Sequence, residues 1–199
     1  MFTRIFPSVV AVVDRSGIPL LTLPSSDHFI VVGGLISAVM GISKAIKGEG
    51  IDYIRIEKGI IFVKPIDEKG CLLMYFKGID DPADAIWVVE LFLSAIKDRV
   101  RDLVEGFIIG KDVEEITRIY EEFTKKLEEI YGCLEVIDKA IQHNRKLQKK
   151  ARDILIKCSD GLILYENNKV FVDHKTIRSR NMGIDAFLET LKRCLREIK

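Results

Sequence analysis

The densest group of side chains that could carry out acid–base chemistry or hold a cation is Asp80, Asp81 and Asp84. Pro82 stands among them, and proline favours the first position of a helix. An aspartate just before such a proline is a good N-cap, and a further acidic residue in the first turn complements the helix dipole. The spacing therefore predicts a helix start with Asp81 as N-cap, rather than a carboxylate site.

Two glycine-rich stretches invite comparison with a phosphate-binding loop: Gly33-Gly34 and Gly41-Ile42-Ser43-Lys44. Such a loop needs Lys followed by Ser or Thr, a fixed glycine spacing, and a position just before a helix. Here Ser43 precedes Lys44, and the glycines fall inside a stretch that we expect to be helical. We therefore expect no nucleotide site at this place.

Histidine and cysteine offer no metal-ligand pattern. His28, His143 and His174 are far apart in the sequence, and none has a carboxylate or a cysteine at the spacing of metal ligands. The four cysteines, at positions 71, 133, 158 and 194, form no CxxC pair, so we expect no disulfide framework and a reducing, cytoplasmic setting. We expect no catalytic residue, metal or cofactor, and an enzyme with an unrecognised site is the weakest of three alternatives.

Charge is unevenly distributed along the 199 residues, whose formal net charge is +1. From residue 143 to the end there are 14 Lys+Arg against 7 Asp+Glu, and the preceding residues hold 17 against 23. This basic C-terminal part raises the question of an anionic partner. The candidate anion-binding residues lie on an expected helix and on a later connection: Arg145, Lys146, Lys149, Lys150, Lys175, Arg178 and Arg180.

Two interpretations of this basic surface stay open. One is an ordinary solvated face, and the other is contact with phosphate groups of nucleic acid or of acidic lipids. Nucleic acid is the less favoured partner because few aromatic residues are interleaved with the basic ones. The two nearby aromatic residues, Tyr165 and Phe171, are expected in the core of a hairpin.

The run between Asp27 and Lys44 contains no Asp, Glu, Lys or Arg and predicts a helix that is apolar on nearly every side. It is shorter than the roughly 20 residues of a membrane span. Gly33, Ser37 and Gly41 recur every four residues, so they form a ridge that lets another backbone approach closely. We expect a partner on this face, although the chain itself could also cover it. The candidate interface residues are Phe29, Val32, Gly33, Ile36, Ser37, Met40 and Gly41.

The first two-thirds of the chain predict an α+β domain. Val9-Val10-Ala11-Val12-Val13 is typical of a strand buried on both faces. A second strand follows the turn at Gly17 and contains Pro19, which suits a strand start or an edge. Three further strands lie between Ile51 and Phe76, around turns at Lys58-Gly59 and Asp67–Gly70. The predicted fold is a five-stranded antiparallel sheet with β-β-α-β-β-β-α order.

The remaining sequence predicts a helical extension and a small C-terminal module. Helices are expected from Pro82 to about Glu105, from Asp112 to Tyr131 and, after an interruption at Gly132, from Leu134 to Lys150. A three-stranded β-meander follows at 154–156, 162–165 and 170–172, with positive φ angles at Asn167-Asn168, and a helix from Ile184 to Ile198 closes the chain. The expected domains are 1–110, 111–152 and 153–199.

The hairpin Val12-Val13-Asp14-Arg15-Ser16-Gly17-Ile18-Pro19-Leu20, in this order of elements, resembles the opening of the longin/roadblock group of regulatory domains. The resemblance extends from Val9 to about Tyr131, and the C-terminal part departs from it. It implies that the helix between strands two and three, often with the neighbouring edge strand, is a dimer surface. It further implies a non-enzymatic scaffold that pairs with itself or a related domain and serves as a platform for a small GTPase. A nucleic-acid- or anion-binding protein is the alternative function.

Overall fold

The computed structural model describes residues 4–14, 18–24, 52–66, 70–104 and 111–198. The chain divides into two compact units, which are described separately. The sheet unit contains Ile5–Val89 and Ile96–Ile119. The C-terminal unit contains Tyr120–Lys199 together with Glu90–Ala95 and Met1–Arg4. The predicted helix between Asp27 and Lys44 lies outside the described residues.

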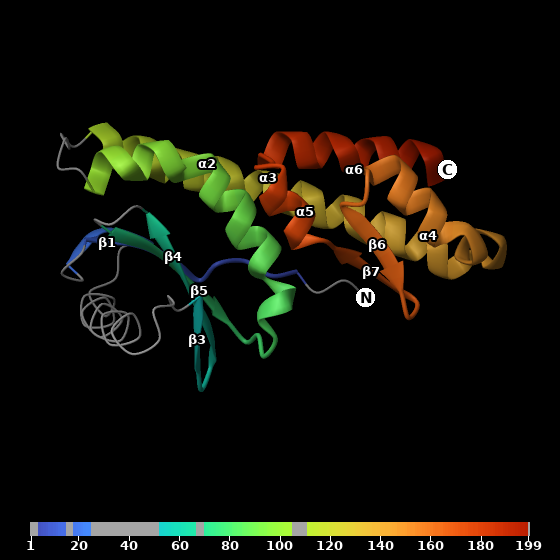
Figure 1. The fold of residues 1–199 in the computed structure, drawn as a ribbon, viewed down its shortest axis with the longest axis horizontal. Coiled ribbons are helices and arrows are strands. Elements are labelled where there is room, and N and C mark those ends of the chain that lie inside the picture. Colours follow the sequence, from blue (N-terminus) through green and yellow to red (C-terminus); the bar gives the residue numbers. More distant parts are fainter. Residues whose placement is uncertain (1–3, 15–17, 25–51, 67–69, 105–110, 199) are drawn as a thin grey trace. The chain divides into compact units, whose positions relative to one another are not determined.

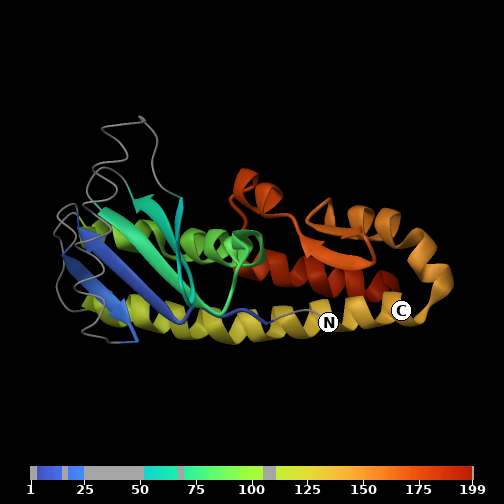
Figure 2. The same cartoon turned by 90° about the horizontal axis from the view of Figure 1, so that it is seen from below.

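The sheet unit is built on five antiparallel strands in the spatial order β2-β1-β5-β4-β3, which confirms the predicted α+β class (Figure 1). The strands are β1 (Val9–Asp14), β2 (Pro19–Leu23), β3 (Tyr53–Ile56), β4 (Gly59–Ile66) and β5 (Gly70–Lys77). Figure 2 shows the parts of helices α2 and α3 that belong to this unit on one face of the sheet. The β-β-…-β-β-β-α order of the described elements agrees with the sequence prediction.

The inner strands are buried on both faces because their side chains are apolar at successive positions. Val10, Ala11, Val12 and Val13 of β1 are all fully buried, as the run of β-branched residues predicts. Val12 lies opposite Leu21 on one side and Leu72 on the other, which fixes the register of the central strand. Pro19 begins β2 at one edge of the sheet, where it interrupts no ladder with a further strand.

The helix start at Asp81 is confirmed. The Asp81 carboxylate accepts the backbone N–H of Ala83 at 2.9 Å and caps the short 3₁₀ helix η1 (Pro82–Asp84). Helix α2 (Ile86–Val104) follows directly, and the Asp84 carbonyl accepts the indole N–H of Trp87 at 3.0 Å. Capping thus accounts for Asp81, and Asp84 helps to join η1 to α2.

The predicted break at Gly132 is wrong. Helix α3 runs without interruption from Lys111 to His143, with Gly132 inside it. One glycine costs only about 1 kcal/mol in a helix interior, and buried residues on both sides of it continue the helical period. The break comes instead at Asn144, whose side chain accepts the N–H groups of Lys146 and Leu147 and caps the next helix, α4 (Arg145–Ser159).

The predicted three-stranded meander is also wrong, because its first strand is part of α4. Ala151, Leu155 and Cys158 are buried at helical spacing, so the apolar residues 154–156 continue the helix. Only β6 (Ile163–Glu166) and β7 (Lys169–Val172) remain as a hairpin. Its turn at Asn167 and Asn168 has φ angles of 50° and 61°, as predicted.

Two helices complete the C-terminal unit. The expected basic connection contains a short helix, α5 (His174–Ser179), because Asp173 caps it by accepting the N–H of Lys175 at 3.1 Å. Helix α6 (Ile184–Ile198) has the predicted bounds and buries Phe187, Leu188 and Leu191. Figures 1 and 2 both show the hairpin between α4 and α5. Within the described residues, no helix is long and apolar enough to cross a membrane.

Candidate functional site

The predicted interface on the uncharged segment is not tested by the structure. Phe29, Val32, Gly33, Ile36, Ser37, Met40 and Gly41 all lie outside the described residues. The candidate partner surface that the structure does describe is the adjoining edge strand, β3. The sequence placed β3 at Ile51–Ile56 but gave no sign that its side chains would stay exposed.

Strand β3 is exposed although it is rich in large apolar residues. Tyr53 is 43% exposed and Ile56 is 41% exposed, whereas Ile54 is half-buried against the strand residues of the core. Tyr53 is held in place by its ring contact with Phe62 on β4, whose centroid lies 6.2 Å away. Phe62 in turn packs edge to face against Phe76 on β5, at 5.6 Å. A row of aromatic rings across β3, β4 and β5 therefore positions a partly exposed tyrosine at the sheet edge.

The outer side of β3 also presents backbone hydrogen-bonding groups. The N–H of Val63 donates to the carbonyl of Asp52 at 2.9 Å, and bonded positions alternate along an antiparallel pair. The backbone groups of Tyr53 and Arg55 therefore point away from β4. Among the described strands, none pairs with this side of β3. Such an edge is a template for pairing with another chain.

The two edge strands of the sheet, β2 and β3, differ in how readily each could pair with a further strand. The opposite edge strand, β2, starts with Pro19 and buries Leu21 and Leu23. Proline at an edge discourages pairing with a further strand. β3 contains no proline, and its exposed side chains are Tyr53, Arg55 and Ile56. The open edge of the described sheet is thus β3.

The second candidate surface is the solvent face of α4. Of the predicted anion-binding residues, Arg145, Lys146, Lys149 and Lys150 are all exposed on this helix. The sequence prediction stopped at Lys150 and so missed Arg152 and Lys157, which the same helix also exposes. The helical spacing of Ala151, Leu155 and Cys158, which are buried, is the sequence signal that would have extended the predicted helix to Arg152 and Lys157.

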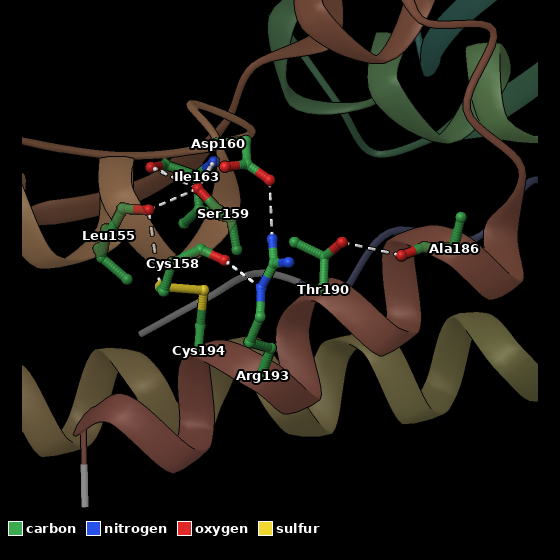
Figure 3. The surroundings of a disulfide bond; sticks show 9 residues. All are labelled: Leu155, Cys158, Ser159, Asp160, Ile163, Ala186, Thr190, Arg193 and Cys194. Atoms are coloured by element: carbon green, nitrogen blue, oxygen red, sulfur yellow. Dashed lines mark hydrogen bonds and ion pairs between the residues drawn. A yellow bond between two sulfur atoms is a disulfide. The ribbon is translucent and has the colours of Figure 1, made fainter.

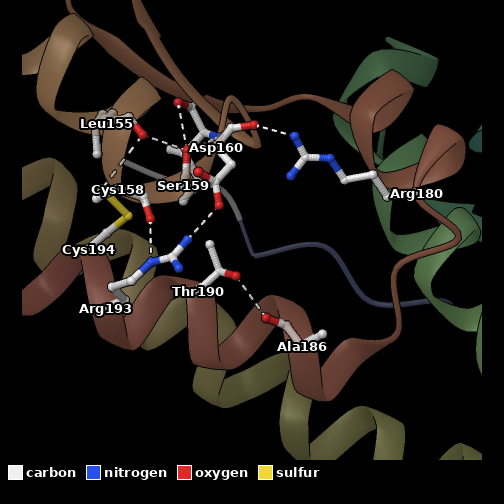
Figure 4. Close-up of polar contacts among 10 residues, drawn as sticks. Leu155, Cys158, Ser159, Asp160, Arg180, Ala186, Thr190, Arg193 and Cys194 are labelled. Carbon is white, nitrogen blue, oxygen red and sulfur yellow. Dashed lines mark hydrogen bonds and ion pairs between the residues drawn. A yellow bond between two sulfur atoms is a disulfide. The ribbon is translucent and has the colours of Figure 1, made fainter.

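The other three predicted residues lie on or next to α5. Lys175 and Arg178 are exposed on this helix. Arg180 follows the helix, and its guanidinium donates to the backbone carbonyl of Asp160 at 2.8 Å (Figure 4). Arg180 therefore joins α5 to the end of α4 as well as adding positive charge. No element pair with Lys175 or Arg178 on one side and α4 on the other is among the main packing contacts of the described residues, and the anion-binding role of all seven residues stays a prediction.

A disulfide holds α4 to α6, contrary to the expectation of no disulfide framework (Figure 3). Cys158 and Cys194 are 36 positions apart in the sequence, but their Cα atoms lie 5.1 Å apart. Next to the disulfide, the guanidinium of Arg193 donates to the carbonyl of Cys158 and to the carboxylate of Asp160, both at 2.8 Å. The pairing escaped sequence analysis because it depends on how two helices pack.

The histidines and carboxylates form no metal site among the described residues. His143 contacts the carbonyl of Lys139 within its own helix at 2.7 Å, and His174 lies in the first turn of α5. His28 is outside the described residues. What the described geometry presents is therefore two surfaces, the β3 edge and the basic face of α4.

Comparison with known proteins adds little to this description. No family model matches the chain, and no curated protein matches it. A solved structure described as "MglB with tetrameric arrangement" is similar over 60% of this chain and 82% of that chain. The sequence identity is 15% and the TM-score is 0.35, so this likeness carries no functional argument.

Proposed function

We propose that the chain is a non-enzymatic scaffold or regulator that pairs through the β3 edge with a second copy of itself or with a related domain. The observation that supports pairing is the combination of outward-pointing backbone groups with exposed Tyr53 and Ile56 on β3. Two β3 edges related by a twofold axis would be antiparallel and would join two sheets into one. The uncharged segment between Asp27 and Lys44 precedes β3 in the sequence and is proposed to extend the same interface.

The proposal that the pair serves as a platform for a small GTPase rests on the longin/roadblock resemblance of the Val12–Leu20 hairpin. Pairing comes first, because a platform of this kind presents a composite surface. The two parts are therefore tested separately, starting with the oligomeric state of the purified chain.

The test of pairing is the replacement Ile56→Lys, measured by light scattering of the chain as it elutes from a sizing column. A charged lysine in place of an exposed apolar side chain on an edge strand discourages pairing with another strand, so we expect the dimer to dissociate. The matched control is Ile18→Lys, because Ile18 is also exposed, at 59%, but precedes the other edge strand. We expect the control to keep the wild-type mass.

A monomeric wild type at high concentration, or equal dissociation of both variants, would refute pairing through β3. Gly33→Leu and Gly41→Leu test the proposed contribution of the preceding segment in the same assay. If only these two variants dissociate the dimer, pairing stands but β3 is not the interface.

The platform proposal is then tested by adding small GTPases in their nucleotide-bound forms to the dimer and to Ile56→Lys. Failure of the GTPases to bind the intact dimer would refute the platform proposal and leave the pairing proposal unaffected.

A further inference from the structure

Helix α4 concentrates positive charge more strongly than any other described element. Six of its 15 residues are basic, and Asp153 is its one acidic residue. The basic residues, all of them exposed, are Arg145, Lys146, Lys149, Lys150, Arg152 and Lys157. The opposite side is buried through Ala151, Leu155 and Cys158.

Several other cations of the same unit have a counter-ion, whereas these six have none among the described residues. Arg4 pairs with Glu135, Lys126 with Asp185, and Arg193 with Asp160, at 2.7–2.8 Å. Within the described part of the chain, none of the six α4 side chains forms an ion pair. Their mutual repulsion is therefore not offset by an ion pair within the described residues, and an external anionic surface would relieve it.

The cations form two rows along the helix. Arg145, Lys149 and Arg152 are spaced by four and three residues, and the next position in that row is Ile156, which is 38% exposed. Lys146, Lys150 and Lys157 form the second row, which also contains the exposed Asp153. At 1.5 Å per residue the basic residues from Arg145 to Lys157 form a strip about 18 Å long, with the apolar Ile156 near one end.

Specific contacts hold both ends of α4 in place. Asn144 caps its first turn, and the Cys158–Cys194 disulfide fastens its last turn to α6. Ser159 accepts the N–H of Ile163 at 2.9 Å, which joins the helix end to β6 (Figure 3). The basic strip can therefore lie against another surface without first having to fold.

We propose that the solvent face of α4 binds the surface of a membrane that contains anionic lipids. Clusters of four to eight Lys and Arg on an amphipathic helix are the pattern that attracts acidic headgroups, and an apolar residue among them can enter the headgroup boundary. The α4 strip has both features. The inference is independent of the proposed pairing, which uses the other unit.

Nucleic acid fits the observations less well. Binding to single strands uses aromatic side chains on which successive bases stack, and α4 carries none. Among the described residues of the C-terminal unit, Phe171 on β7 is the one exposed aromatic side chain, at 42%. It was expected in the hairpin core, and by itself it offers a single stacking platform. The experiment below includes oligonucleotides as a competing outcome.

The test is sedimentation of the full chain with vesicles of phosphatidylcholine alone or with roughly one third phosphatidylglycerol, at low and at physiological salt. We expect binding only to the anionic vesicles, and weaker binding as salt rises. The variant Lys149→Glu/Lys150→Glu should weaken binding by at least about tenfold, because each cation near an anionic bilayer contributes about fivefold. The matched control is Arg118→Glu/Lys125→Glu, which makes the same change of net charge on α3.

A control that loses as much affinity as the α4 variant would overturn the proposal, because net charge alone would then explain binding. Absence of vesicle binding at low salt would overturn it as well. Stronger binding to an oligonucleotide than to anionic vesicles would replace it by the nucleic-acid alternative.

Ile156→Ser should lower vesicle affinity without changing the salt dependence, and an unchanged affinity would refute entry of Ile156 into the headgroup region. Circular dichroism checks that each variant is folded.

Discussion

At the scale of single residues, the surroundings of Gly59, Gly132 and Cys71 determine which substitutions each position tolerates. Gly59 has a φ of +154°, and a Cβ at this position would collide with the carbonyl oxygen of Phe76. Gly132, in contrast, lies within α3 where a Cβ would meet nothing. Cys71 on β5 is buried in the strand core, and desolvation raises the pKa of its thiol from 9.0 to about 12. Gly59 and Cys71 allow tests of the sheet, and Gly132 allows a test of α3.

The first prediction contrasts two glycines. Gly59→Ala should lower the free energy of unfolding by about 2 kcal/mol or more, because the turn must move away from β5. Gly132→Ala should raise it by about 0.5–1 kcal/mol, because alanine is the better helix former. Urea unfolding followed by circular dichroism measures both changes. A Gly59→Ala variant as stable as the wild type would contradict the close approach of Gly59 and Phe76.

The second prediction concerns the pH dependence of stability through Cys71. A pKa that is higher in the folded chain means that the folded state holds its proton more tightly, so this contribution is complete below about pH 9 and is lost as pH rises towards 12. The urea midpoint should therefore fall between these pH values. The urea midpoint of Cys71→Ala should fall less steeply over the same pH range, although this variant is less stable than the wild type at every pH. Parallel slopes for the two proteins would show that the thiol is not desolvated.

At the scale of elements, caps decide where the helices of the C-terminal half begin and end. Asn144 separates α3 from α4 by accepting two backbone N–H groups, at 3.0 and 3.1 Å. Asp160 ends α4 in a left-handed conformation with a φ of 53°, and its N–H donates to the carbonyl of Ile156. Asp160 also binds Arg180 and Arg193, so one residue fixes the helix end and ties α5 and α6 to it.

The third prediction tests the cap between α3 and α4. Asn144→Ala should lower the free energy of unfolding by about 1 kcal/mol, because the first-turn N–H groups of α4 lose their acceptor. Amide exchange of Lys146 and Leu147 should accelerate, as hydrogen exchange with fragment separation can measure. Asn144→Asp is the control, since a carboxylate can cap the same N–H groups and favours the helix N-terminus. Equal losses in the two variants would indicate that capping is not the role of Asn144.

At the scale of the whole molecule, the two units are stabilised differently. The sheet unit is held by apolar strands such as β1, β4 and β5, whose inner residues are fully or almost fully buried. The C-terminal unit adds a disulfide and ion pairs between helices, such as Arg193–Asp160 and Lys126–Asp185. Its basic surface and the open β3 edge belong to different units. The proposed lipid binding and the proposed pairing can therefore be separated by mutation.

The fourth prediction is that loss of the disulfide weakens the C-terminal unit selectively. Closing a loop of 36 residues contributes about 3–4 kcal/mol by chain entropy, so Cys158→Ala/Cys194→Ala should speed amide exchange in α4, α5 and α6. Exchange in β1, β4 and β5 should change little. Cys133→Ser, which alters a half-buried thiol of the same unit, is the control. Alkylation of the unreduced, denatured wild type should modify two cysteines, and modification of all four would refute the disulfide.

The sequence alone determined the parts of the fold that follow from local pattern. The β-branched run at Val9–Val13, the cap at Asp81, the Asn167-Asn168 turn and the bounds of α6 all depend on residues close together in the chain. Local patterns misled where an apolar run suits both strand and helix. Residues 154–156 continue α4, and the helical period through Gly132 outweighs the glycine.

Only the tertiary structure decided the features on which the candidate sites depend. The exposure of Tyr53 and Ile56 follows from the position of β3 at the edge, which a list of strands does not give. The approach of Cys158 to Cys194 and of Arg193 to Asp160 follows from the packing of α4 against α6. The same packing shows which cations have counter-ions and, among the described residues, leaves those of α4 without one. Contacts between residues distant in the chain have no local signature, so folding had to reveal them.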